Sequence, residues 1–106
     1  MYSKKVVIVN QAGLYGKLAT KFIQLANNFK STLFVEYESK KANAKSLLGV
    51  LSLALPQNCE VVVTGSGIDE REAVDKLVEF IEEGGIYHEL TENHEDAIVG
   101  DAKPGE

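Results

Sequence analysis

The stretch Gly13–Thr20 constrains the fold more than any other part of the chain, because it joins two different hydrophobic periodicities. The β-branched run Lys5–Val9 before it is typical of a strand, and apolar residues at helical spacing follow it over residues 16–29. Two glycines flank a single tyrosine, Tyr15, at the junction. A tight strand-to-helix turn points the N–H groups of the first helical turn at the residue before the helix. The junction therefore predicts a site for an anion, most simply a phosphate.

The rest of the chain alternates between strand and helix patterns. Further strands are expected at residues 32–37, 40–44 and 60–64, and further helices at 47–53 and between Asp69 and the glycines at 84–85. In the resulting order, β-α-β-β-α-β-α, strands two and three can pair as a hairpin. The two long helices can then cover one face of a four-stranded antiparallel sheet. We therefore predict an α+β fold, an open-faced two-layer sandwich.

Helix-capping residues support these boundaries. Ser46 stands directly before the short apolar helix and is its natural N-cap. Asp69 and Glu72 have the spacing of a capping box, which accounts for both as structural residues. The glycine pair 84–85 is expected to end the last helix.

Alternation along the expected strands divides their side chains between two faces. The inward set is apolar and consists of Val6, Ile8, Leu33, Val35, Val61 and Val63. The outward set then includes Val7, Phe34 and Val62. Three apolar side chains on an open face favour a cover, either a second subunit or the C-terminal segment folding back. The alternative is that they are ordinary exposed apolar residues.

Composition limits the function classes. Hydrophobic and charged contents of 44% and 25% are those of an ordinary globular protein. We expect one folded domain at residues 1–86 and an acidic, flexible tail at 87–106, where six acidic residues oppose one lysine. The domain is formally neutral, which argues against nucleic-acid binding. Because the sequence has no membrane-length apolar run and no signal-peptide pattern, we expect a cytoplasmic protein that does not bind membranes.

We expect no cofactor and no metal. Cys59 is the single cysteine, and we interpret it as a small apolar residue at a strand edge. His88 and His94 lie among acidic residues but match no metal-ligand spacing.

Two motifs carry a resemblance to a known family. Gly13-Leu14-Tyr15-Gly16-Lys17-Leu18-Ala19-Thr20 resembles the active-site loop of HPr, the histidine-containing phosphocarrier of the bacterial phosphoenolpyruvate:sugar phosphotransferase system. The family's pattern there is Gly-Ile/Leu-His-Ala-Arg-Pro-Ala. Residues 43–53, Asn-Ala-Lys-Ser-Leu-Leu-Gly-Val-Leu-Ser-Leu, resemble the family's regulatory serine and the apolar helix behind it. The resemblance covers residues 2–86 and implies the HPr fold.

The sequence departs from the family at the residues that handle phosphate. Tyr15 stands where the family has its phosphorylated histidine, Lys17 where it has an arginine, and Leu18 where it has a proline. A neutral imidazole is nucleophilic at pH 7, whereas a phenol with a pKa near ~10 needs an activating base. A lysine also lacks the two-pronged grip of arginine on phosphate. We therefore predict that this chain does not relay phosphate from phosphoenolpyruvate.

The loop keeps a helix N-terminus that suits an anion. We expect Tyr15, Gly16, Lys17 and Thr20 to bind an anion or a protein partner. Two alternatives for Tyr15 are a plain packing residue and a phosphorylation site.

Ser46 is the candidate regulatory site. The resemblance implies that a bifunctional serine kinase/phosphorylase modifies it, and that enzymes and a catabolite-control transcription regulator dock beside it. A phosphate at Ser46 would lie on a helix N-terminus, where backbone N–H groups favour negative charge. Leu47, Leu48 and Leu51 are candidate partner contacts. The alternatives are that Ser46 is only a cap and that the leucines belong to the core.

We interpret the chain as an HPr-like regulatory or adaptor protein of the phosphotransferase system, and not as an enzyme. Two other functions stay open at this point. One is a phosphocarrier with an unusual acceptor. The other is an HPr-fold scaffold that has left the system and forms a homodimer through the outer sheet face.

Overall fold

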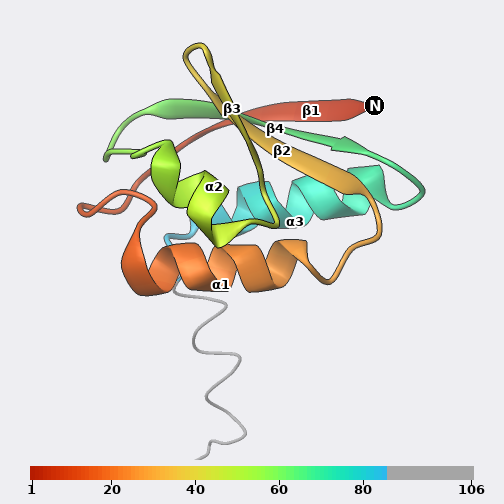
Figure 1. Cartoon of the computed structure of the whole chain (residues 1–106), viewed down its shortest axis with the longest axis horizontal. Coiled ribbons are helices and arrows are strands. Elements are labelled where there is room, and N and C mark those ends of the chain that lie inside the picture. Colours follow the sequence, from red (N-terminus) through yellow and green to blue (C-terminus); the bar gives the residue numbers. More distant parts are fainter. Residues whose placement is uncertain (86–106) are drawn as a thin grey trace, which may run out of the picture.

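The computed structural model describes residues 1–85, so the predicted tail, 87–106, lies outside the described residues. The elements are β1 (Tyr2–Val7), α1 (Gly16–Ala26), β2 (Thr32–Tyr37), β3 (Lys40–Asn43), α2 (Leu47–Ser52), β4 (Glu60–Ser66) and α3 (Glu70–Glu82). The order β-α-β-β-α-β-α confirms the prediction (Figure 1).

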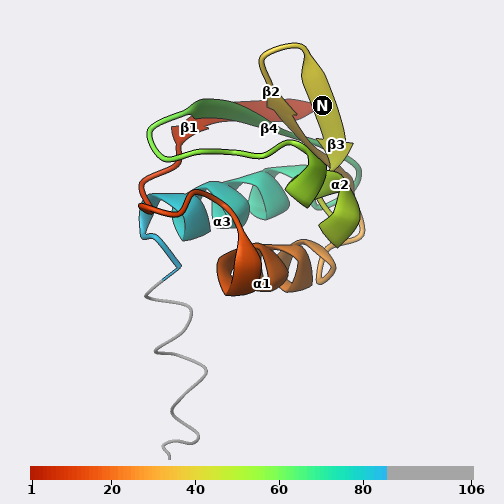
Figure 2. The same ribbon diagram turned by 60° about the vertical axis from the view of Figure 1, so that its left-hand side comes forward.

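The four strands form one sheet in the order β1-β4-β2-β3, and all neighbours are antiparallel. Helices α1 and α3 lie across one face of this sheet, and the short α2 lies beside α1 (Figures 1 and 2). β1 begins earlier than predicted, because Tyr2–Lys4 pair with residues 63–65 of β4. Tyr37 and Lys40 pair across the tight turn that joins β2 to β3, as expected for a hairpin.

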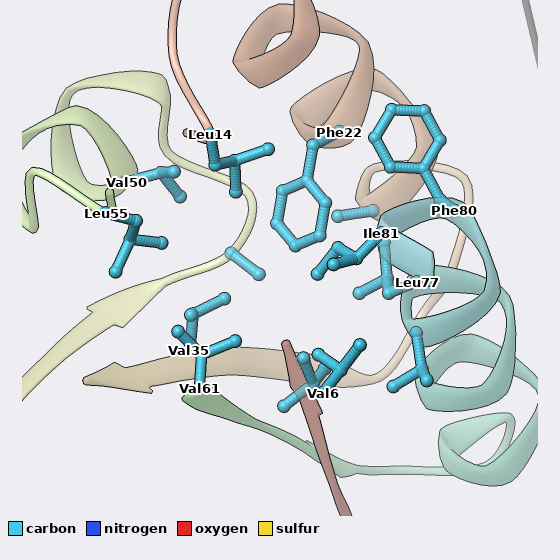
Figure 3. Close-up of a cluster of buried hydrophobic side chains, with 14 of the residues drawn as sticks. Val6, Leu14, Phe22, Val35, Val50, Leu55, Val61, Leu77, Phe80 and Ile81 are labelled. Atoms are coloured by element: carbon cyan, nitrogen blue, oxygen red, sulfur yellow. The ribbon is translucent and has the colours of Figure 1, made fainter. Parts of the chain in front are cut away.

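The core lies between the sheet and the two long helices. All six residues that alternation placed on the inner face are buried. From the helices, Phe22 of α1 and Phe80 of α3 meet with ring centroids 6.1 Å apart (Figure 3). Fully burying an aliphatic or aromatic side chain contributes about 1.5–3 kcal/mol, so this shared cluster holds the two layers together.

The outer face of the sheet carries both apolar and charged side chains. Val7 is 43% exposed, and Phe34 and Val62 are partly exposed, which agrees with the predicted outward orientation. The ammonium of Lys41 lies 4.3 Å above the ring of Phe34, so a neighbouring strand already shields this aromatic. Among residues 1–85, no helix covers this face (Figure 2).

The capping box predicted at Asp69 and Glu72 is wrong. Asp69 precedes α3, but its side chain makes no hydrogen bond to that helix. Its carboxylate instead accepts the N–H groups of Lys30 and Ser31, both at 2.9 Å, and the hydroxyl of buried Ser31. Three donors from the α1–β2 connection outcompete the single N–H that a cap would offer. Glu70 reaches back instead and accepts the N–H of Gly67 at 3.0 Å.

These bonds make Asp69 an acid-sensitive link between the α1–β2 connection and the start of α3. The Ser31 hydroxyl, followed by the N–H of Lys30, lowers the pKa of Asp69 from 3.8 to about 2. A depressed pKa means that the carboxylate stabilises the fold above its unfolded pKa and loses this effect as the pH falls towards the folded pKa.

We predict that Asp69→Asn destabilises the protein at pH 7, and that its difference from the wild type shrinks as the pH falls from 5 to 2.5. Urea unfolding across this pH range measures both curves. A difference that stays constant with pH would show that the link does not depend on the ionised carboxylate.

Candidate functional site

Tyr15 directly precedes α1, and its backbone is extended, with φ −147° and ψ 165°. Its side chain is 60% exposed and does not cap the helix. Its carbonyl accepts the N–H of Ala19 at 3.3 Å, so the helix starts directly behind it. The first turn of α1 contains no acidic residue, and the partial positive charge at this helix end is therefore not offset within the turn. The geometry is that of an exposed aromatic on an anion-attracting helix end.

The two glycines of the junction have different roles. Gly13, at φ 75°, lies against the segment after α2, where a Cβ would come within 2.0 Å of the Leu55 carbonyl oxygen. The same carbonyl accepts the N–H of buried Leu14 at 3.1 Å. Gly16, at φ 58°, has open space around it, so only its left-handed backbone conformation favours glycine there. The family pattern has an alanine at that position.

The predicted loop residues lie together on the first turns of α1. Lys17 and Thr20 are exposed, and the Thr20 hydroxyl donates to the carbonyl of Gly16 at 3.3 Å. The structure thus places Tyr15, Gly16, Lys17 and Thr20 around one helix end. Whether this end binds an anion or a partner stays a prediction.

Ser46 caps α2 as predicted. Its side-chain oxygen accepts the N–H of Gly49 at 3.1 Å, and its backbone is extended. Leu47 and Leu48 are 38% and 81% exposed, while Leu51 is partly buried against the core. The expectation that these leucines belong to the core is therefore wrong for Leu47 and Leu48. The one buried residue of α2 is Val50, which turns to the interior (Figure 3).

Helix α2 runs alongside α1 in the opposite direction. At one end, Asn27 donates to the carbonyl of Lys45 at 3.3 Å, and the Lys45 ammonium donates to the carbonyl of Phe29 at 2.7 Å. At the other end lies the Leu14–Leu55 bond. Ser46 therefore lies near the C-terminus of α1, and Tyr15 lies at its N-terminus. Sequence reasoning missed the contacts of Asn27 and Lys45, because nothing local in the sequence marks them.

Within residues 1–85, we find no support for a second functional site. An open groove between β1 and α3 is lined by charged residues, but none of the predicted site residues lines it. Lys4 pairs there with Asp75 at 3.0 Å. No group of acidic, histidine or cysteine side chains in this range could hold a metal, and His88 and His94 lie outside it. None of the described helices is long and apolar enough to cross a membrane.

Cys59 is buried just before β4, as predicted for a small apolar residue. Burial raises the pKa of its thiol. A protonated, buried thiol is a poor nucleophile, so the structure gives this cysteine no chemical role.

Comparison with known proteins places the chain in a family. The model of the family described as "PTS HPr component phosphorylation site" matches residues 2–83. The chain belongs to the HPr family. It is 41% identical over 83 residues to the HPr-like protein Crh of Bacillus subtilis (strain 168). The match covers 78% of this chain and 98% of that relative.

Solved structures give the same assignment. The crystal structure of HPr from Thermoanaerobacter tengcongensis matches with a TM-score of 0.77 and 39% identity, over 79% of this chain and 94% of that one. The crystal structure of Bacillus subtilis Crh matches with a TM-score of 0.64 and 40% identity, over 79% of this chain and 97% of that one. That Crh structure is described as a dimer with a swapped domain.

We predict that Ser46→Ala lowers the free energy of unfolding by about 1 kcal/mol, because the N–H of Gly49 loses its partner. The corresponding fall in Tm is roughly 4–8 °C for a domain of this size. Thermal and urea unfolding check both values. Ser46→Asp is the matched variant, since aspartate also caps helices, and it should stay close to the wild type. An alanine variant as stable as the wild type would contradict the capping role.

Proposed function

We propose that this chain is a regulatory or adaptor protein of the phosphotransferase system, and that it does not carry phosphate through histidine. The observation that supports this is the replacement of the family's phosphorylated histidine by Tyr15, on a loop that otherwise keeps the family's helix N-terminus. A phenol is almost fully protonated at pH 7. A phosphotyrosine would also be a stable ester and a poor donor.

The neighbours of Tyr15 support the same proposal. Lys17 supplies a single point charge where arginine would hold two phosphate oxygens. Leu18 replaces the proline and contacts the end of α3, since a Cβ on Gly85 would lie 2.4 Å from its Cδ1 atom. Its role here is packing. The helix end therefore still attracts an anion, while the nucleophile and the clamp of a phosphocarrier are absent from it.

We infer that partners dock on α2 and on the loop at Tyr15, and that Ser46 controls this docking. Leu48 is the most exposed leucine of α2, and it lies two residues from the Ser46 hydroxyl. A phosphate on that hydroxyl would add a charge of −1.5 to −2 beside an apolar contact surface. The Bacillus subtilis relative is described as a catabolite repression HPr. That description supports a regulatory role in catabolite repression for this chain, while the serine kinase/phosphorylase and the transcription regulator are partners that the family resemblance implies.

The remaining expectations stay proposals. They are a domain at residues 1–86, a cytoplasmic location, and a homodimer through the outer sheet face as an alternative. The swapped dimer described for Crh supports self-association in general. It does not favour the outer face, where Lys41 lies over Phe34.

We predict no acid-labile label on the wild-type protein after incubation with labelled phosphoenolpyruvate and the general phosphotransferase enzyme. Authentic HPr in the same reaction is the positive control. Acid-labile label on the wild type would disprove the proposal. The matched variant Tyr15→His with Lys17→Arg and Leu18→Pro restores the family pattern, and it should gain the label.

We predict that HPr kinase/phosphorylase with ATP adds one phosphate to the wild-type chain. Mass spectrometry of the peptide that contains Ser46 locates it. Ser46→Ala should remain unmodified, while Ser39→Ala, an exposed serine in the β2–β3 turn, should be modified normally. The regulatory role of Ser46 fails if this chain stays unmodified under conditions that modify authentic HPr.

A further inference from the structure

The charges of the described residues are segregated along the chain. Residues 1–35 contain five lysines and no acidic residue. Helix α1 carries Lys17 and Lys21 on one face, one turn apart, and no acidic residue. Helix α3 carries five acidic residues against one arginine and one lysine. Residues 1–86 are therefore neutral overall, but helix α1 carries only positive charges and helix α3 is acidic.

The last described residue, Gly85, lies directly beside helix α1. Gly84 and Gly85 end α3 with φ values of 64° and 77°. The carbonyl of Gly84 accepts a hydrogen bond from Asn10 at 3.1 Å, and the N–H of Gly85 donates to Phe80 at 3.0 Å. Gly85 also lies against Leu18. The end of α3 thus meets the first turns of α1, as both ribbon views show (Figures 1 and 2).

The sequence that follows lies beyond the family match and carries the opposite charge. The family match ends at residue 83, although the Bacillus subtilis relative is covered over 98% of its length. Residues 87–106, named here the acidic segment, hold six acidic residues and one lysine. Their net charge of −5 equals that of the whole chain.

The acidic segment can reach α1 within its first few residues. Glu89, four residues beyond Gly85, can lie up to about 14 Å from it. Lys21 lies only about 4.5 Å from Leu18 along the helix axis. The helix end at Tyr15 also favours negative charge. Because the acidic segment is tethered beside α1, its effective concentration there is on the order of millimolar.

We propose that the acidic segment docks on the face of α1 that carries Lys17 and Lys21. It acts as a built-in competitor for the surface that acidic or phosphorylated partners would use. The docking follows from charge, tether and exit point, while the competition rests on the proposed function.

A spin label tests the docking in the full-length chain without any partner. The label is attached at Ala97→Cys, because the native Cys59 is buried and does not react readily. We expect loss of intensity for the backbone amide NMR signals of residues 16–22, and unchanged signals for the β2–β3 hairpin. At 1 M salt, where the screening length falls to about 3 Å, the lost signals should return.

Matched charge variants test whether the lysines of α1 cause the loss of signal. Lys17→Gln with Lys21→Gln should restore the α1 signals in the spin-labelled chain. Lys40→Gln with Lys41→Gln removes the same charge from the hairpin, where Lys41 lies over Phe34 on the outer sheet face, and should restore nothing.

Three results would overturn the proposal. They are no localised loss on α1, a loss that survives Lys17→Gln with Lys21→Gln, and a loss that appears only when isotope-labelled and spin-labelled chains are mixed. The last result would place the segment on a second copy. Since no kinase or phosphoryl donor is involved, failure here leaves the proposed function intact, and failure of the proposed function leaves the docking intact.

Discussion

The joint between the β1–α1 loop and the segment after α2 is the contact on which the rest of the site depends. Leu14 is buried there and donates its N–H to the carbonyl of Leu55, and Gly13 fits where any side chain would collide with that carbonyl. This contact holds the start of α1 against the segment that follows α2. The exposed position of Tyr15 follows directly, because the residue before it is held in the core.

Much of the fold could be predicted because its signals are local. Hydrophobic spacing located both long helices, and alternation assigned residues such as Val35 and Val61 to the inner face. Ser46 was recognisable as a cap because a cap depends on neighbours in sequence. The extent of β1 was not recognisable, since Tyr2–Lys4 join the sheet only through their pairing with β4.

The one wrong prediction and the one left open both depend on residues that are distant in sequence. Asp69 has the spacing of a capping box, but three donors from the α1–β2 connection hold its carboxylate. Leu47 and Leu48 are predicted as partner contacts with the core as an alternative, because a six-residue helix is too short for a periodic pattern to decide. Their exposure depends on how α2 lies against α1, which Asn27 and Lys45 determine from outside the helix.

The cap at Ser46 also sets a condition on any enzyme that modifies this residue. The hydroxyl oxygen that would attack a phosphoryl donor is the atom that accepts the N–H of Gly49. If the side chain rotates about its Cα–Cβ bond to meet an incoming donor, the N–H of Gly49 loses its side-chain acceptor. Such a rotamer would cost about as much free energy as the capping bond contributes, roughly 1 kcal/mol. Substitutions that strengthen or weaken this capping bond would therefore change how readily Ser46 is modified. They would leave the modifying enzyme and the exposed leucines of α2 unchanged.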